Sequence, residues 1–256
     1  MRALLSLRNP SGRIRHMASG VLVFEGMTVG FLPGDLTISV DESGATSSKA
    51  ILSSAYNVLP IWLRIASDQL RTAKQASEAV ATRWDENEDA KRELLVAELE
   101  PSLLVFVACG IALDALYDQL RGFANVTRDD IRAWKTNKTA RGAQIAEIIK
   151  RVYKLKATET AAFKQSITEI LKLRDMAVHP SLELKQTCSR PDIPVGVDWK
   201  FSAYKYSNAA QCFAGTMNML IHLCGRPSGI ADVDKQMENI VKALEQLNVM
   251  RKAAPV

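Results

Sequence analysis

Several residue types are scarce in this chain of 256 residues, and each shortage excludes a class of protein. There are only four cysteines, with no C-x-x-C pair among them, so the sequence predicts neither a disulfide-stapled secreted fold nor a zinc ribbon. This cysteine usage fits a reducing, cytoplasmic compartment. Aromatic residues make up 6% of a chain that is 47% apolar, which favours a core of aliphatic side chains on helices over a predominantly β fold.

The sequence also lacks recognisable targeting segments. The opening residues MRALLSLRNP reach Arg8 and Pro10 after a short apolar stretch, which is unlike the hydrophobic region of a signal peptide. The longest apolar run, residues 103 to 113, is shorter than the roughly 20 residues that cross a bilayer. We therefore expect a cytoplasmic protein without membrane association.

The motifs of several large enzyme classes are absent. The sequence has no G-x-x-x-x-G-K-[ST] phosphate loop, no G-x-G-x-x-G dinucleotide fingerprint and no G-x-S-x-G nucleophile elbow. There are three histidines, His16, His179 and His222, and the nearest grouping with a cysteine, His222-x-Cys224, supplies two side chains on different helical faces, where a zinc site needs three or four ligands. We expect neither a metal nor another cofactor.

The hydrophobic pattern predicts a mainly α protein with a short N-terminal β segment. Residues 1 to 16 are a basic arm, and the stretch 21 to 40, with its Pro33-Gly34-Asp35 turn signal, predicts two or three short strands in a small meander. We assign residues 1 to 45 to this arm with strands and residues 46 to 256 to a helical domain. The spacing of apolar side chains predicts helices from after Gly44 to about 70, over 87–120, from 128, and over 140–155, 159–178, 207–223 and 232–249.

Local signals indicate where these helices begin and end. The pair Thr127 and Asp130 has the spacing of a capping box, and Thr158 and Ser207 are the expected N-caps of two later helices. Pro60 is expected to kink or restart the first helix. Residues 181 to 205 break the helical pattern, and we interpret them as a long loop or a small hairpin.

One histidine lies in a segment that suits catalysis. Arg174, Asp175 and His179 stand in LRDMAVHP, at the end of the predicted helix 159–178. Arg174 falls on the apolar stripe of that helix, and an arginine buried there needs an anion. Asp175 precedes His179 by four residues, so its carboxylate is placed to accept a hydrogen bond from the imidazole. An arginine for a phosphate and a histidine that moves protons suit the transesterification of RNA by its 2'-hydroxyl.

This segment, Arg174-x4-His179 with a polar residue directly after the arginine, resembles the R-x(4-6)-H signature of the HEPN superfamily. The resemblance implies an antiparallel helical bundle, here over about residues 87 to 225, and a homodimer with both motifs at its interface. It implies metal-independent ribonuclease activity in a toxin–antitoxin or antiviral role, with Arg174 and His179 catalytic and Asp175 supporting them. Ser181 stands where one toxin subgroup has a tyrosine, which is a departure from that subgroup.

Positive charge is concentrated directly before this motif. The chain has a net charge of +5, and residues 132 to 174 alone hold eleven basic and three acidic side chains. Such a run is either a solvated helix face or a surface for an RNA backbone, and interleaved aromatic residues favour the second. Asp114, on a neighbouring helix, either faces the motif or is a solvated carboxylate. We assign substrate binding to Lys135, Lys138, Arg141, Lys150, Arg151, Lys154 and Trp199.

Our leading hypothesis is a metal-independent endoribonuclease of HEPN type that acts on RNA as a homodimer, with an antitoxin or sensor protein as a further partner. One alternative is a catalytically silent helical module that binds nucleic acid, a nucleotide or a partner protein. Another is a purely structural dimerisation domain, in which Arg174 and Asp175 form ordinary ion pairs and His179 only caps a helix.

Overall fold

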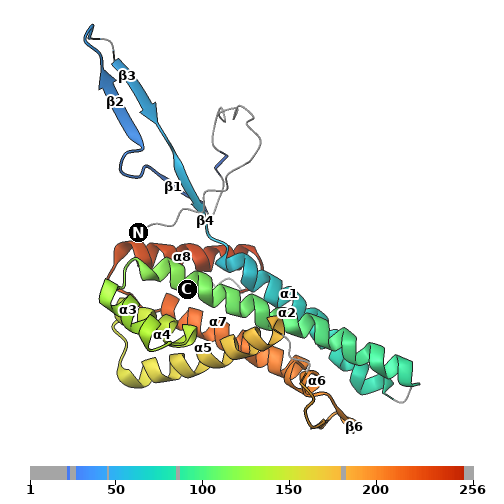
Figure 1. Cartoon of the computed structure of the whole chain (residues 1–256). Helices are drawn as coiled ribbons and strands as arrows, with labels where there is room; N and C mark the ends of the chain where they lie inside the picture. Colours follow the sequence, from blue (N-terminus) through green and yellow to red (C-terminus); the bar gives the residue numbers. More distant parts are fainter. Residues whose placement is uncertain (1–21, 24–26, 45, 85–86, 180–182, 251–256) are drawn as a thin grey trace, which may run out of the picture. The chain divides into compact units, whose positions relative to one another are not determined.

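The structure is a computed structural model that describes residues 22–23, 27–44, 46–84, 87–179 and 183–250. The predicted basic arm, residues 1 to 16, lies outside the described residues, as does Ser181. The predicted fold class is confirmed, because the described part of the chain has eight helices and only short antiparallel strands (Figure 1). The chain divides into two compact units, Met1–Asn57 and Val58–Val256.

The N-terminal unit contains two nested pairs of antiparallel strands. The inner pair joins β2 (Leu36–Val40) to β3 (Thr46–Ala50), and the outer pair joins β1 (Met27–Gly30) to β4 (Ser53–Tyr56). The predicted turn at Pro33-Gly34-Asp35 is present, since Gly34 has a φ of +90° and the Asp35 amide donates to the Leu32 carbonyl at 2.9 Å. The strands are thus nested rather than arranged as a meander.

Residues 46 to 56 contain β3 and β4, so the prediction of a helix directly after Gly44 is wrong. The Ser- and Thr-rich segments of β3 and β4 pair with β2 and β1. This pairing outweighs the helix-like spacing of Ile51 and Tyr56, because β propensity is decided by the strand that lies opposite. The helical unit accordingly begins at Val58 rather than at residue 46.

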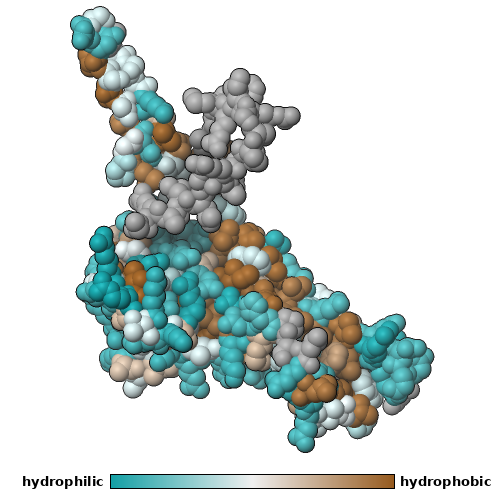
Figure 2. Space-filling model, in the orientation of Figure 1, coloured by the Kyte–Doolittle hydropathy of each residue, from teal (hydrophilic) through white to brown (hydrophobic). Residues whose placement is uncertain are grey.

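Hydrophobic side chains remain exposed on the N-terminal strands. Leu36, Ile38 and Val40 occupy alternate positions of β2 and therefore share one face, and each is at least 60% exposed. Figure 2 shows hydrophobic surface along these strands. Their partners on β3 are exposed as well. The strand pairs therefore depend mainly on hydrogen bonds and turns, with little apolar burial of their own.

The helical unit is arranged around one long helix, α2 (Glu88–Arg121). Its main packing partners are the helices α1 (Leu59–Arg83), α4 (Arg141–Tyr153), α5 (Ala157–Val178) and α7 (Tyr206–Cys224). The remaining elements are α3 (Arg128–Thr136), the hairpin β5 (Cys188–Arg190) and β6 (Ile193–Val197), α6 (Trp199–Ala203) and α8 (Ala231–Gln246). The core between these helices is aliphatic, as the composition predicted, and includes Leu113, Leu116, Ile149, Ile167 and Leu220.

By length and composition alone, α2 is apolar enough to cross a membrane. However, 56% of its most apolar window of 18 residues is buried against the rest of the chain. The helices α1, α4, α5 and α7 cover it inside the bundle. A mostly buried core helix meets the same criteria of length and composition.

The helix ends follow the local signals in part. Thr127 accepts a hydrogen bond from the Asp130 amide and Asp130 accepts one from the Thr127 amide, so the predicted capping box is present at α3. Pro60 lies in the first turn of α1, where it begins the helix and causes no kink. Thr158 and Ser207 are not N-caps, because α5 begins at Ala157, after Lys156, and α7 begins at Tyr206, after Lys205.

Of the two structures expected for residues 181 to 205, a long loop or a small hairpin, the described residues 183 to 205 contain the hairpin. A buried ion pair connects this segment to α2. Arg190 on β5 donates to Glu98 of α2 at 2.8 Å, and both side chains are at most 2% exposed. Arg190 also donates to Asp192 and to the carbonyl of Phe201, while Glu98 accepts from the Tyr206 amide at 2.8 Å. The hairpin, α6 and the start of α7 are therefore held to α2 through one polar centre.

We expect Arg190→Met to destabilise the helical unit by about 3–5 kcal/mol, because it leaves the Glu98 carboxylate buried without its cation. Equilibrium unfolding in urea measures this change. The matched control is Lys74→Met, since Lys74 forms an exposed pair with Glu78 at 3.8 Å, and its effect should stay below about 1 kcal/mol. Equal effects of the two variants would contradict a structural role for the buried pair.

Candidate functional site

The Asp114 carboxylate connects three helices at the predicted motif. It accepts a hydrogen bond from Arg174 Nη1 of α5 at 3.0 Å and one from Arg141 Nε of α4 at 2.7 Å. Arg174 is largely buried, with a side chain 17% exposed, whereas Asp114 is 28% exposed. Asp114 thus faces the motif, and the anion that Arg174 needs is supplied within the chain.

Two glycines allow the helices to approach closely enough for this bridge. A Cβ atom at Gly110 of α2 would lie 2.8 Å from Cγ and 3.0 Å from Cβ of Arg174. A Cβ atom at Gly142 of α4 would lie 2.9 Å from the Cα atom of Thr168 on α5. Because glycine has no Cβ atom, α5 can lie directly against α2 at Gly110 and against α4 at Gly142. This close approach lets Arg174 reach Asp114.

The relation between Asp175 and His179 differs from the prediction. Asp175 accepts a hydrogen bond from Arg174 Nε at 2.6 Å, and within the described residues the His179 ring has no hydrogen-bond partner. His179 follows the last residue of α5 with a φ of −123° and a ψ of 67°, so it has left the helical path that would place its side chain one turn above Asp175. The imidazole is exposed to solvent, beyond the end of the helix.

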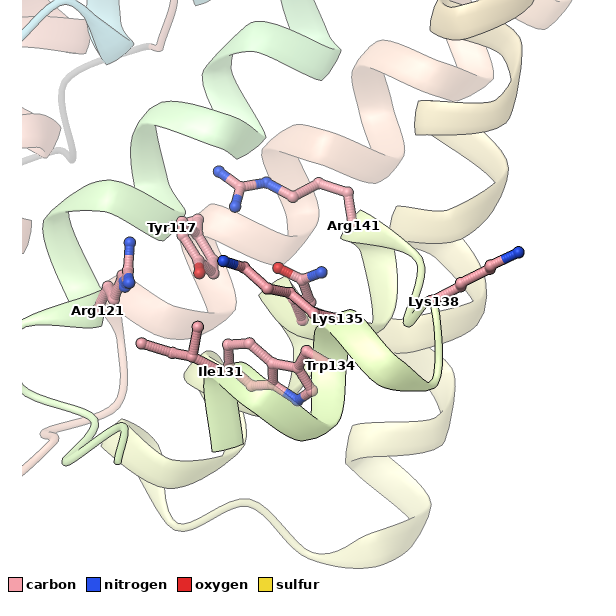
Figure 3. Close-up of a pocket in the computed structure, with 8 residues that line it drawn as sticks. Tyr117, Arg121, Ile131, Trp134, Lys135, Lys138 and Arg141 are labelled. Carbon is pink, nitrogen blue, oxygen red and sulfur yellow. The ribbon is translucent and has the colours of Figure 1, made fainter. Parts of the chain in front are cut away.

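A pocket of about 330 Å³ lies beside the Asp114 bridge (Figure 3). Its walls come from the last turns of α2, from α3 and from the start of α4, and no carboxylate is among the side chains that line it. Arg141 is shared, because its guanidinium bonds to Asp114 and also lies 3.6 Å from the ring centre of Tyr117. The lining residues are Tyr117, Arg121, Ile131, Trp134, Lys135, Lys138, Arg141 and Gln144.

Of the seven predicted substrate-binding residues, three line this pocket, namely Lys135, Lys138 and Arg141. Arg151 instead forms a two-bond ion pair with Asp130, at 2.8 and 3.0 Å, and a further bond to Glu147. Lys150 lies 3.4 Å from the same Glu147.

The last two predicted binding residues lie elsewhere in the helical unit. Lys154 is an exposed residue at the C-terminal end of α4, with a left-handed φ of +52°. Trp199 is on α6, where its ring lies 6.1 Å from that of Tyr204 and within 4.9 Å of Lys185 Nζ. The basic run is therefore divided among separate surfaces, and only part of it converges on the pocket.

The sequence reasoning missed Arg121 and Tyr117, which contribute to the pocket from α2. Both residues lie before the basic run of residues 132 to 174, which was the part of the chain expected to bind the substrate. The available signal was their spacing of four residues near the end of a helix, which places a cation beside an aromatic ring. Arg121 lies 5.8 Å from the centre of the Tyr117 ring.

The described residues contain no group of three or more His, Cys, Asp and Glu side chains placed to hold a metal ion. Comparison of the chain with protein-family models, with curated proteins and with solved structures finds no match.

We expect Gly110→Ala to destabilise the protein by about 1–3 kcal/mol, because the added methyl group must displace the stem of Arg174 or separate α2 from α5. Urea unfolding measures this change. Gly215 of α7 is the matched control, since a Cβ there meets nothing within 4 Å. Gly215→Ala should be neutral or stabilising by up to about 1 kcal/mol. Destabilisation by both variants alike would argue against the close helix contact.

The Asp130 and Arg151 pair predicts a pH dependence of stability. Hydrogen bonds from Arg151 and from Thr127 hold the pKa of Asp130 well below its ordinary value. A carboxylate with a depressed pKa in the folded state stabilises the fold above the unfolded-state pKa, and this contribution is lost as the pH falls through the folded value. Asp130→Asn should therefore lower the melting temperature clearly at pH 7 and progressively less below pH 4.

The matched control for this comparison is Asp129→Asn. Asp129 is one residue away on α3 and forms an exposed pair with Arg132 at 3.2 Å. Its melting temperature should follow that of the unchanged protein at every pH. A difference between Asp130→Asn and the unchanged protein that does not vary with pH would contradict the titration of Asp130.

Proposed function

We propose that the protein is a metal-independent endoribonuclease of HEPN type. The observation that carries the proposal is the end of α5, where a fixed arginine and an exposed histidine follow each other within five residues. Asp114 and Asp175 orient the Arg174 guanidinium, and Nη2 has no hydrogen-bond partner within the described residues. The two N–H groups of Nη2 are thus available to a phosphate oxygen, and the exposed His179 ring can accept or donate a proton.

The reaction needs few groups. The 2'-hydroxyl of RNA attacks the neighbouring phosphorus while an imidazole accepts its proton, and the bond from phosphorus to the 5'-oxygen breaks as that oxygen gains a proton. Arg174 stabilises the charge that develops on the phosphoryl oxygens. The products are a 2',3'-cyclic phosphate and a 5'-hydroxyl. Within the described ranges one chain supplies a single imidazole at this site, so a homodimer would supply the acid and the base together.

In the cell, the proposed ribonuclease would act on cytoplasmic RNA as a toxin or antiviral effector. An antitoxin or sensor protein would then control it. The toxin role and the antiviral role both rest on the resemblance of Arg174-x4-His179 to the HEPN motif. An antitoxin or sensor protein would be identified by a change in the rate of RNA cleavage when it is added.

The test is cleavage of single-stranded RNA in EDTA. His179→Ala should reduce the rate by about 100- to 10,000-fold, the usual contribution of a general acid or base. His222→Ala is the matched control, because His222 is an exposed histidine on α7, 3.7 Å from Glu159 and outside the motif. Its rate should equal that of the unchanged protein. A 2'-deoxy substitution at the scissile position should abolish cleavage.

The proposal fails if His179→Ala cleaves as fast as the unchanged protein, or if cleavage requires Mg²⁺. One observation favours the second candidate, a catalytically silent binding module: Asp175 bonds to Arg174 and leaves His179 without an orienting carboxylate. That candidate predicts RNA binding without cleavage, and equal affinity of His179→Ala and the unchanged protein.

A further inference from the structure

We propose that the pocket formed by α2, α3 and α4 binds a single nucleotide through its phosphate and its base, as a site separate from Arg174 and His179. The proposal does not require the protein to cleave RNA. It rests on the charges and the aromatic side chain that line the pocket.

Three cations of the pocket are not neutralised by a carboxylate within the described residues. Arg121 has only its contact with the Tyr117 ring, and neither Lys135 nor Lys138 forms an ion pair in the described part of the chain. Figure 3 shows the Lys135 side chain extended toward Tyr117, whereas that of Lys138 extends away from the others. Arg121 and Lys135, which come from different helices, are therefore the groups placed to hold an anion.

Arg141 adds oriented hydrogen-bond donors to one wall, while its charge is balanced by Asp114 and by Asp118, which lies 3.9 Å away. Asp114 accepts a hydrogen bond from the Nε atom of Arg141, and the Cζ atom of this guanidinium lies 3.6 Å from the centre of the Tyr117 ring. This guanidinium is already oriented before a ligand arrives, so binding costs little side-chain entropy there. A phosphate in the pocket would meet one positioned arginine and two exposed cations.

The other wall offers an apolar surface to a base. Trp134 is half-buried, packs against the core with one part of its ring system and lines the pocket together with Ile131. Indole rings stack on bases of any sequence, whereas the Tyr117 ring is already covered by Arg141. The volume of about 330 Å³ is at the lower end of ligand pockets, which suits one nucleotide and excludes several.

The experiment measures binding by calorimetry in EDTA, with the His179→Ala protein so that RNA stays intact. The probes are AMP, inorganic phosphate and a 2'-O-methyl RNA oligonucleotide. Lys135→Gln and Arg121→Gln should each weaken nucleotide binding about tenfold and reduce its salt dependence by about one charge. Both residues are exposed, so the variants should fold, and equal melting temperatures verify this.

Arg132→Gln is the matched control, because Arg132 lies on α3 beside the pocket residues but pairs with Asp129 outside it. It changes the net charge equally and should alter affinity less than twofold. Loss of AMP binding in the pocket variants supports a site for free nucleotides. Loss of oligonucleotide binding alone supports a site for one nucleotide of a strand.

Two results would overturn the proposal. One is an equal loss of affinity in Arg132→Gln and the pocket variants, which indicates nonspecific attraction to positive charge. The other is that inorganic phosphate binds as tightly as AMP, since the base then contributes nothing. Neither result bears on the cleavage assay with His179→Ala, so failure of the pocket and failure of the ribonuclease are distinguishable.

Discussion

A single carboxylate, Asp114, determines how the candidate site is built. It bonds to guanidiniums from α4 and α5, and α2, which carries it, is the helix on which the bundle packs. The close approach at Gly110 and Gly142 is what allows the three helices to share this acid. If any of these helices moved, an arginine would lose its anion while partly buried, which is a costly state. The close packing of α2, α4 and α5 and the pairing of Asp114 with the two arginines therefore depend on each other.

Ion pairs within the chain divide the basic side chains into two groups, those paired with a carboxylate and those that are not. Arg174, Arg141 and Arg151 are each held by carboxylates, so their charge is compensated and their orientation is fixed. Arg121 and Lys135 keep their charge available beside an aromatic surface. A net charge counted along the sequence cannot separate these two groups, because a salt bridge joins residues far apart in the chain. Unpaired cations contribute more to the electrostatic field at the surface than cations whose charge a carboxylate balances.

A second polar centre, Glu98 and Arg190, holds the hairpin and α6 to the bundle. Its position in the interior explains why residues 183 to 205 are ordered although their sequence breaks the helical pattern. Tyr204 extends this attachment, since its hydroxyl donates to the Leu173 carbonyl on α5 at 2.9 Å and its ring meets Phe106 edge-on. Burial raises the pKa of Tyr204 to about 12, so the hydroxyl stays a donor at neutral pH.

The sequence by itself determined the elements whose signals are local: the helical period over α2, α4 and α5, the capping box at Thr127 and the turn at Gly34. It also located Arg174 and His179 at a helix end. Only the tertiary structure decided that residues 46 to 56 are strands, that Asp114 faces Arg174, that Asp175 turns to Arg174 instead of His179, and that Arg121 joins Lys135. Those outcomes depend on which segments meet in space, and periodicity and capping carry no information about distant partners.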